Sequence, residues 1–392
     1  MSLRRCLLFP LFVVLVALLP FAGVSSARGG PLEVVASGLD NPRGLDFGPW
    51  GGLYVAEAGR GGEGPCIMGP EGGNLCAGAS GAITKVWHGK QRRVLEGLPS
   101  IAAEGSPATP ESPEVLPGSD ALGPHDISFS GFSAYFVVGL GGDPALREDL
   151  GELGPEFGQL YKASPFRGVR AVADLAAFEA EEDPDQAVVP PDQKEPNSNP
   201  TSVLARHGRQ YVVDAGANDL LRVGHKGRIR VLAVFPPRLV EAPPGIPDLP
   251  PEIPMQAVPT AVVRGPDHAL YVSQLTGFPF PMGGANIYRI EPGPEPDLDP
   301  EVYASGFTNV TDLAFGPDGS LYVVEIATNG LLSGDPTGAL KRIAPDGSVE
   351  TIASEGLVAP YGVAVSRHGR IYVSTHSTEA GGGEVVRVHP GG

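Results

Sequence analysis

The chain carries little charge for its size, and little of that charge is positive. Charged residues make up 19% of its 392 residues, and 28 Lys and Arg stand against 45 Asp and Glu, for a formal net charge of −17. An acidic chain without basic stretches is a poor partner for nucleic acid or an anionic membrane surface. We therefore expect neither partner.

The sequence also lacks helical periodicity and the short motifs of common catalytic folds. No long stretch repeats its apolar residues with a helical period, and there is no Gly-x-Ser-x-Gly, no His-Glu-x-x-His and no phosphate-binding Gly loop with Lys. Glycine (55 residues) and proline (42) are abundant instead, in a chain that is still 42% hydrophobic. This composition is too apolar for disorder and is typical of many short strands joined by turns.

The first 27 residues have the form of a signal peptide. Arg4 and Arg5 precede an apolar run over residues 6–24, and Ser25-Ser26-Ala27 forms a small-residue cleavage site. An uncleaved membrane anchor is the alternative. No later segment is long and apolar enough to span a bilayer. We predict cleavage near Ala27 and a secreted or periplasmic protein.

Cysteine is scarce, with three residues in the chain. Cleavage removes Cys6 and leaves Cys66 and Cys76, ten residues apart in a Gly-rich loop. In an exported protein this pair predicts a disulfide bond. A metal site is less favoured, because no His or third Cys lies nearby.

One phrase, a short strand, a tight turn and an apolar strand with an aromatic residue, recurs six times. Its copies are PRGLDFGPWGGLYVAE (42–57), PHDISFSGFSAYFVV (124–138), PTSVLARHGRQYVVD (200–214), PTAVVRGPDHALYVSQ (259–274), VTDLAFGPDGSLYVVE (310–325) and PYGVAVSRHGRIYVS (360–374). A third strand follows in most units, and a fourth in most of them. Six units of four strands predict an all-β fold, a six-bladed β-propeller.

The two ends of the chain predict how the ring closes. The last unit stops after its third strand, and EVVASGLDNP (33–42) matches ETIASEGLVAP (350–360) of the preceding unit. We expect the N-terminal strand to complete the last blade. The predicted organisation is a signal peptide at 1–27 and a six-bladed β-propeller at 28–392.

The long loops are expected on one face of the ring. Turns after first and third strands are short, whereas connections after second and fourth strands are long, and function usually lies on such loops. We call this side the loop face. Two of its loops are unusual. The proline-rich stretch 236–254 is expected to be extended, and the acidic stretch EAEEDPDQ (179–186) is expected to be a solvated loop tip.

Polar side chains are predicted to converge where the axis opens on the loop face. Those at the ends of second strands are Glu57, Asp214, Gln274, Glu325 and, one residue later, His376, with Gly139 in the second unit. Those at the starts of inner strands are Asn41, Arg43, His125, Asp126, Asn199, Thr201, Thr260, Asn309, Thr311 and Tyr361. Their oxygens suit Ca²⁺ or another hard cation. The alternative is that the strand-end acids only accept backbone N–H bonds.

A short connection in the third unit, DAGANDLLRV (214–223), holds further oxygens close together. Asp214, Asn218 and Asp219 bracket it. They are suited to a cation or sugar hydroxyls, and equally to a self-satisfied Asx turn.

Several of these features together resemble the ScyD/ScyE family of exported propellers, named for scytonemin pigment gene clusters of cyanobacteria. They are the signal segment, the cysteine-bearing first loop, SGLDNPRGLDFGPWGGLYVAEAG (37–59), GPHDISF (123–129) and VVDAGANDLLRV (212–223). The resemblance covers essentially all of residues 28–392 and implies the fold and export rather than a reaction. More broadly the repeats look like NHL and gluconolactonase-type propellers. That likeness implies a divalent cation, with calcium as the candidate, held by Glu57, Asn199 and Asp214.

Three functions follow as hypotheses. We favour an exported binding or scaffold protein that recognises a small molecule, glycan or protein on the loop face, because no reaction-specific motif is present. A calcium-dependent lactonase- or esterase-like hydrolase is the first alternative, and whether the chain is an enzyme stays open. A quinone-dependent sugar dehydrogenase is the second, with His125 and Arg43 as its candidate residues.

Overall fold

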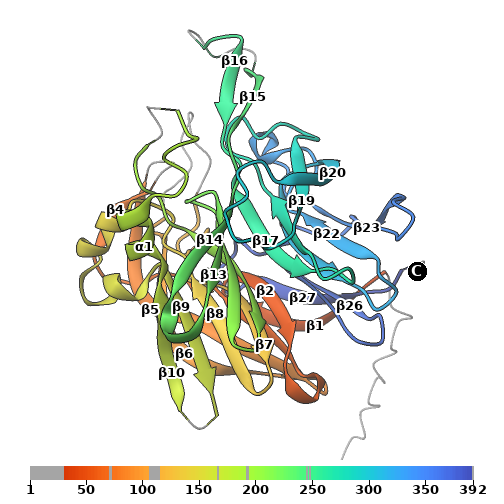
Figure 1. Cartoon of the computed structure of the whole chain (residues 1–392). Helices are drawn as coiled ribbons and strands as arrows, with labels where there is room; N and C mark the ends of the chain where they lie inside the picture. Colours follow the sequence, from red (N-terminus) through yellow and green to blue (C-terminus); the bar gives the residue numbers. More distant parts are fainter. Residues whose placement is uncertain are drawn as a thin grey trace, which may run out of the picture.

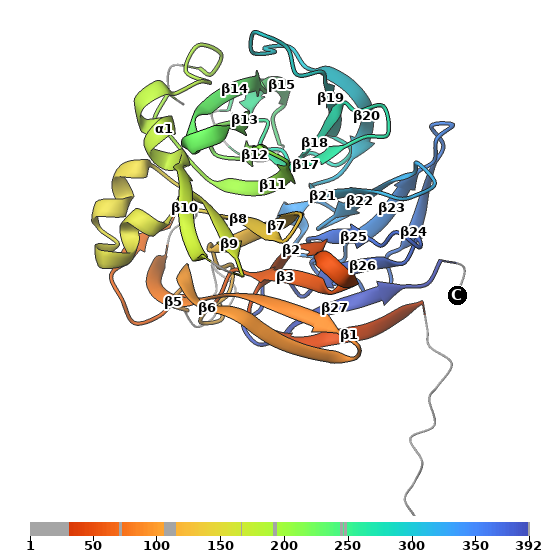
Figure 2. The ribbon, with the colours of Figure 1, turned by 60° about the horizontal axis from the view of Figure 1, so that its bottom comes forward.

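The computed structural model describes residues 31–69, 73–105, 115–165, 167–190, 194–243, 246 and 249–390. The predicted signal peptide at 1–27 lies outside these residues. Six sheets, each with four antiparallel blade strands, surround a central axis (Figures 1 and 2). The predicted six-bladed β-propeller is confirmed.

The blades follow one another along the chain, and each runs from an inner to an outer strand. Blade 1 contains β2 (Pro42–Phe47), β3 (Leu53–Glu57), β5 (Asn74–Trp87) and β6 (Lys90–Ala103). Blade 2 contains β7 (Pro124–Ser130), β8 (Ser133–Val138), β9 (Gln159–Ser164) and β10 (Gly168–Asp174). Blade 3 contains β11 (Pro200–Arg206), β12 (Arg209–Asp214), β13 (Asp219–Val223) and β14 (Ile229–Val234).

The second half of the ring repeats this order. Blade 4 contains β17 (Pro259–Arg264), β18 (Leu270–Gln274), β19 (Ala285–Ile290) and β20 (Glu301–Phe307). Blade 5 contains β21 (Val310–Phe315), β22 (Leu321–Glu325), β23 (Ala339–Ile343) and β24 (Val349–Ala353). Blade 6 contains β25 (Val363–Val365), β26 (Ile371–Thr375), β27 (Gly383–Val388) and β1 (Leu32–Leu39).

The N-terminal strand closes the ring as predicted. β1 pairs antiparallel with β27, from Leu32 opposite Val388 to Leu39 opposite Gly383. Ala36 and Leu39 are buried against blade 1. The pairing covers an edge that would otherwise expose backbone N–H and C=O groups.

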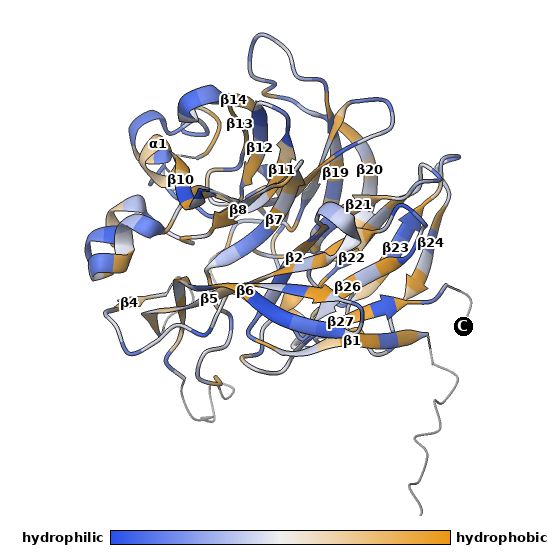
Figure 3. Ribbon diagram, turned by 90° about the horizontal axis from the view of Figure 1, so that it is seen from below, coloured by the Kyte–Doolittle hydropathy of each residue, from blue (hydrophilic) through white to orange (hydrophobic). Residues whose placement is uncertain are grey.

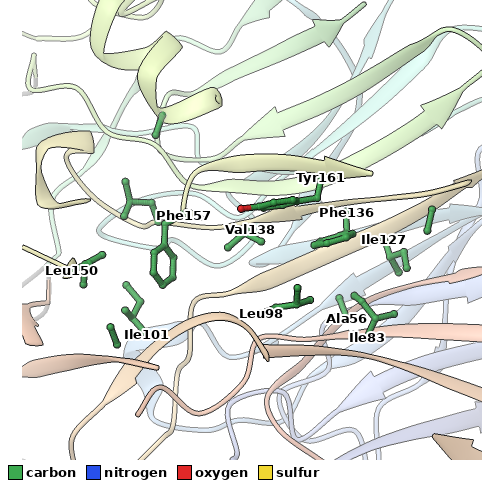
Figure 4. Close-up of a cluster of buried hydrophobic side chains, with 14 of the residues drawn as sticks. Ala56, Ile83, Leu98, Ile101, Ile127, Phe136, Val138, Leu150, Phe157 and Tyr161 are labelled. Carbon is green, nitrogen blue, oxygen red and sulfur yellow. The ribbon is translucent and has the colours of Figure 1, made fainter. Parts of the chain in front are cut away.

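The core is divided into one apolar cluster at each of the six interfaces between blades. At the interface of blades 1 and 2, the Phe136 and Tyr161 rings stack with centroids 5.2 Å apart, beside Ile83 and Ile127 (Figure 4). The second strand of each blade is buried on both faces, which explains the continuous apolar runs of the repeat. The outer strand β6 carries a hydrophilic stretch instead (Figure 3).

One backbone hydrogen bond recurs in all six blades at the loop face. In blades 1 to 5 the residue after the second strand donates its N–H to the carbonyl of the residue before the inner strand, over 2.9 to 3.1 Å; in blade 6 the donor, Ser377, lies just beyond the end of β26 and the acceptor, Ala359, lies shortly before β25, at 3.3 Å. The pairs are Ala58 to Asn41, Gly139 to Gly123, Ala215 to Asn199, Leu275 to Val258, Ile326 to Asn309 and Ser377 to Ala359. These hydrogen bonds fix the backbone at the points from which polar side chains approach the axis.

The loop-face connections carry the remaining elements. They are β4 (Cys66–Met68), η2 (Pro144–Glu148), η3 (Gly151–Glu156), α1 (Leu175–Glu182), the β15–β16 hairpin (Arg238–Glu241 and Glu252–Met255) and η6 (Leu331–Ser333). The short 3-10 turns η1 (Pro49–Gly51) and η5 (His225–Gly227) lie between blade strands. The predicted disulfide joins Cys66 of β4 to Cys76 of β5. No helix in the described part of the chain has the length and apolar character that crossing a bilayer requires.

Two loop expectations need correction. The acidic stretch 179–186 is not a solvated tip, because it begins within α1, and Glu179 and Asp185 are buried. Helix α1 starts where Asp174 accepts a hydrogen bond from the Ala177 N–H. At the two ends of the proline-rich stretch, β15 (Arg238–Glu241) and β16 (Glu252–Met255) pair antiparallel, and these strands project from the loop face (Figure 1).

Candidate functional site

The second position of the inner-strand repeat differs between the two halves of the ring. In blades 3, 4 and 5 it is threonine, and each hydroxyl donates to a backbone carbonyl of the next blade. Thr201 donates to the Thr260 carbonyl over 3.0 Å, Thr260 to Val310 over 2.8 Å, and Thr311 to Tyr361 over 2.7 Å. In blades 3, 4 and 5 the threonine at the second position therefore joins its own blade to the next one.

Blades 6, 1 and 2 carry Tyr361, Arg43 and His125 at this position, and these three blades are consecutive around the ring. The Arg43 Cζ lies 4.8 Å from the centre of the Tyr361 ring. The His125 ring lies 5.8 Å from the same ring, inclined by 63°. We call these three residues, with Asn199, the axial cluster.

Arg43 is a buried cation with few partners. Arg43 is only 6% exposed, and its Nη2 donates a hydrogen bond to the Ala121 carbonyl over 2.9 Å. Among the described residues Nε has no hydrogen-bond partner, and the guanidinium forms no ion pair. Burial lowers the pKa of Arg43, while Tyr361 and Asp120 act in the opposite direction. A guanidinium stays protonated even so.

His125 is a neutral imidazole beside this cation. Burial, and then the charge of Arg43, lowers the pKa of His125 to about 3, and a backbone hydrogen bond with Gly123 offsets part of the shift. Its Nδ1 has no partner among the described residues, and neither has the Asn199 Oδ1. Both atoms flank Gly139: a Cβ built there would lie 2.5 Å from Asn199 Oδ1 and 2.9 Å from His125 Nδ1. A side chain at position 139 would clash with both atoms, so only glycine fits between these two unpartnered polar groups.

Carboxylates line the axis near this cluster. Asp126 accepts hydrogen bonds from Ser202 Oγ and the Val203 N–H, both over 2.9 Å, and so joins blade 2 to blade 3. Asp312 accepts from the Val363 N–H over 2.7 Å and joins blade 5 to blade 6. Burial raises the pKa of both carboxyl groups, and the negative charge of Asp126 adds to the shift at Asp312. Asp126 therefore has a structural contact that holds neighbouring blades together.

The predicted strand-end residues are engaged within their own blades. Glu57 accepts from Arg93 and Thr84, and from the Asp40 N–H over 2.9 Å. Asp214 accepts from Ser198 Oγ over 2.7 Å and from the Asn199 N–H over 2.6 Å.

Glu325 accepts from the Thr308 N–H and from Lys341 Nζ, both over 2.8 Å. Gln274 accepts from the Asn286 N–H over 3.1 Å, and His376 Nδ1 lies 2.7 Å from Glu379 Oε1. The acids accept backbone N–H groups, as the capping alternative expects, but Glu57 and Glu325 also pair with Arg93 and Lys341, which that alternative does not include.

Two of the predicted asparagines, Asn309 and Asn218, support loops. Asn309 donates to the Leu275 carbonyl over 3.0 Å and accepts from the Leu331 N–H. Asn218 donates to Asp185 Oδ2 over 2.8 Å. Of the predicted calcium ligands Glu57, Asn199 and Asp214, only Asn199 has an oxygen without a partner among the described residues. This set is therefore a poor fit to a shared cation at the axis.

Sequence reasoning missed one group of residues, the acids of 179–185. Glu179, Asp183 and Asp185 each offer a carboxylate oxygen, and the three oxygens lie within 4.8 Å of one another. The acidic run was the available signal, but the burial of Glu179 and Asp185 is a tertiary effect.

Two surface hollows lie apart from the axial cluster. One, of about 620 Å³, is lined by Asp143, Arg147, Ala177 and Pro196, among others. The other, of about 380 Å³, lies at the disulfide and Arg60. Neither is lined by Arg43, His125 or Asn199.

Comparisons with known proteins bear on the fold alone. No protein-family model and no curated protein matches the sequence. Similar solved structures include virginiamycin B lyase from Staphylococcus aureus (12% identity, TM-score 0.44, 91% of this chain and 99% of that chain). A glucose dehydrogenase has 14% identity and a TM-score of 0.48, covering 91% and 99%. Regucalcin, a calcium-binding protein from Agrobacterium tumefaciens, has 11% identity and a TM-score of 0.49, covering 91% and 92%.

Proposed function

We propose that this chain is an exported binding propeller of the ScyD/ScyE type, which recognises the anionic group of a small molecule at the loop-face end of its axis. One observation carries the proposal: Arg43 is a buried guanidinium whose partners among the described residues are one carbonyl and one aromatic ring. Asp120 is near enough for its charge to act on the pKa of Arg43, but among the described residues no carboxylate forms an ion pair with the guanidinium. Burying a cation without a directly paired counter-charge is costly, and a bound carboxylate removes much of that cost. Guanidinium groups bind carboxylates through paired, charge-assisted hydrogen bonds.

The neighbours of Arg43 are suited to the same ligand. His125 is neutral, so it adds no second cation, and its Nδ1 and the Asn199 Oδ1 remain available for a hydroxyl or amide of the ligand. The equivalent threonines in blades 3, 4 and 5 join blades, whereas Arg43 and His125 depart from that pattern. This departure supports a binding role for the half of the ring formed by blades 6, 1 and 2.

Export is supported by two features of the chain. Residues 1–27 have the form of a signal peptide. The Cys66–Cys76 disulfide is a bond that persists in oxidising compartments. The protein is proposed to be secreted or periplasmic.

A calcium-dependent lactonase is less well supported, because it needs at least three converging ligands at the axis. Glu57 and Asp214 direct their carboxylates to partners in their own blades. A quinone-dependent dehydrogenase would place its cofactor at His125 and Arg43, the same residues to which the anion-binding proposal assigns the ligand.

The experiment is a titration of purified protein with acetate, benzoate and gluconate, each against its neutral amide, by calorimetry and thermal shift. We expect saturable one-site binding of at least one carboxylate and none of its amide. Arg43→Gln should weaken that binding at least tenfold, while Arg209→Gln, which alters an exposed arginine, should not change it. Arg43→Lys should retain part of the affinity, because it keeps the charge but not the planar pair of donors.

The proposal fails if no carboxylate binds the folded parent more tightly than its amide. It also fails if Arg43→Gln, shown to be folded by circular dichroism, binds as well as the parent.

A further inference from the structure

A buried group of acids lies at the loop-face side of blade 3, apart from the axial cluster. Two chain segments build it: the end of α1 with the turn after it, and the turn from β12 to β13. Glu179, Asp183 and Asp185 of the first segment each present an oxygen, all within 4.8 Å of one another. Asp183 ends α1 with a left-handed backbone (φ 40°), which turns the chain so that Asp185 faces Glu179.

Asp219 of the second segment is the independent observation that points to a ligand. The residue is fully buried, at 0% exposure, and neither carboxylate oxygen has a hydrogen-bond partner among the described residues. Glu179, 2% exposed, likewise has an unpartnered Oε2. Buried polar atoms are nearly always paired in native proteins, so three such oxygens at one place require an explanation.

The two segments are held together at this point. Asn218, next to Asp219 in the chain, donates its side-chain amide to Asp185 Oδ2 over 2.8 Å. Burial raises the pKa of Asp219 well above its usual range, and the charges of Asp214, Glu179 and Asp185 add to that shift. These carboxylates therefore lie close enough to repel one another.

No protein cation offsets this charge. Among the described residues, no Lys, Arg or His nitrogen forms an ion pair with Glu179, Asp183, Asp185 or Asp219. Two equally buried strand-end acids do have a cation, since Glu57 pairs with Arg93 and Glu325 with Lys341, whereas Asp214 is satisfied by a hydroxyl and backbone N–H groups. Where this fold buries a carboxylate elsewhere at a strand end, it can supply a positive side chain.

We propose that Glu179, Asp183 and Asp185 bind a calcium ion, whose charge also compensates the buried carboxylate of Asp219. All donors are oxygens and three are carboxylates, which suits Ca²⁺, a hard cation that accepts six to eight oxygen ligands in flexible geometry. Mg²⁺ more often takes one or two carboxylates and keeps several waters. Zinc, copper, iron and nickel prefer nitrogen or sulfur donors, which this group lacks.

The ion would have a mechanical consequence for the loop face. It would tie the connection between blades 2 and 3 to the β12–β13 turn, and through the 2.9 Å bond from Asn218 to Gln256 to the base of the β15–β16 hairpin. Asp214 in the same turn accepts the Ser198 hydroxyl and the Asn199 N–H. Calcium would thus stabilise the side of the axial opening to which Asn199 belongs, without contacting Arg43.

The test uses purified protein stripped with EDTA, and then titrated with CaCl₂ or MgCl₂ by calorimetry and followed by thermal unfolding. Three variants are compared: Asp185→Asn, Asp219→Asn and the control Glu181→Gln, which alters an exposed acid of the same helix. We expect one calcium per chain, weaker magnesium binding, and a rise in Tm with calcium that follows the binding affinity. Asp185→Asn should weaken calcium binding at least tenfold, and Glu181→Gln should leave it unchanged.

The Asp219→Asn variant distinguishes a metal site from a group of acids that is only protonated. In EDTA the variant should be more stable than the parent, because Asp219 must either bury its charge or take up a proton, and asparagine does neither. In saturating calcium the order should reverse, because the parent gains more from the ion. A stabilisation of equal size in both conditions would overturn the proposal, as would the absence of any calcium effect on the folded parent. Arg43→Gln should bind calcium normally, so this test is independent of the proposed anion site.

Discussion

The strand-end acids have either a structural or a metal-binding role, and Glu57 is the residue at which the two can be told apart. The substitution Glu57→Gln tests this with almost no change in side-chain size. The carboxylate accepts four hydrogen bonds, from Thr84 Oγ1 at 2.5 Å, the Asp40 N–H at 2.9 Å, and Arg93 Nε and Nη2 at 3.1 and 2.5 Å. A glutamine keeps one acceptor oxygen and replaces the other with an NH₂ group, which faces donors. The charge that pairs with Arg93 is lost.

The expected loss of stability is about 2–4 kcal/mol. Removing one partner of a fully buried pair costs about 3–5 kcal/mol. Two observations reduce that figure here: the Arg93 side chain is 32% exposed, and it keeps Asp40 Oδ2 at 2.9 Å. With an unfolding entropy of about 2.1 cal/mol/K per residue over roughly 360 residues, the loss corresponds to a fall in Tm of roughly 3–5 °C.

The assay is urea unfolding followed by circular dichroism, with Glu96→Gln as the matched control on β6. Glu96 is exposed, so its substitution should change stability by less than about 0.5 kcal/mol. Calcium affinity should be the same in Glu57→Gln and the parent. A stability loss below about 1 kcal/mol, or calcium binding weakened by Glu57→Gln alone, would refute the structural assignment and restore Glu57 as an axial ligand.

Three further predictions concern the ring itself. Burial raises the pKa of Asp46 to about 6 and raises that of Asp126 as well. The folded state then binds more protons than the unfolded chain above about pH 4, so stability should fall as the pH rises from about 4 to 6 and beyond. Urea midpoints at pH 5 and 8 check this, and Asp126→Asn should flatten the difference. Phe136→Ala should lower the free energy of unfolding by about 3–5 kcal/mol, because the ring is fully buried between blades 1 and 2. Phe132→Ala, at an exposed phenylalanine, should lower it far less in the same unfolding assay. Reduction of Cys66–Cys76 should lower stability by up to about 3 kcal/mol, the chain-entropy value for a loop of this length, measured by unfolding with and without reductant.

The fold was predictable because the same two-strand sequence pattern occurs six times in the chain. Each copy of the phrase joins two apolar strands through a tight turn, and one four-stranded sheet cannot bury both its faces. Closure by β1 was also predictable, since residues 33–42 repeat the sequence of the strand that a complete blade requires. The short and long turns alternate in sequence, so the position of the loop face followed from strand direction alone.

The site was only partly predictable, because a residue's position on a face does not determine its partner. Glu57 and Asp219 are both acids at strand ends near the loop face, yet Glu57 meets Arg93, whereas Asp219 has no cation beside it among the described residues. The difference depends on side chains from other strands and loops, which no single repeat encodes.

By itself, the sequence determined the propeller, its closing strand, the disulfide and the face that carries the long loops, because these depend on repeated local patterns and strand direction. Only the tertiary structure decided which polar groups remain without partners. It buries Arg43 beside Tyr361 with no carboxylate in contact among the described residues, and it brings Asp219 to the acids of 179–185. Burial and missing counter-charge, which arise only when distant segments pack together, mark these two places as the candidates for binding.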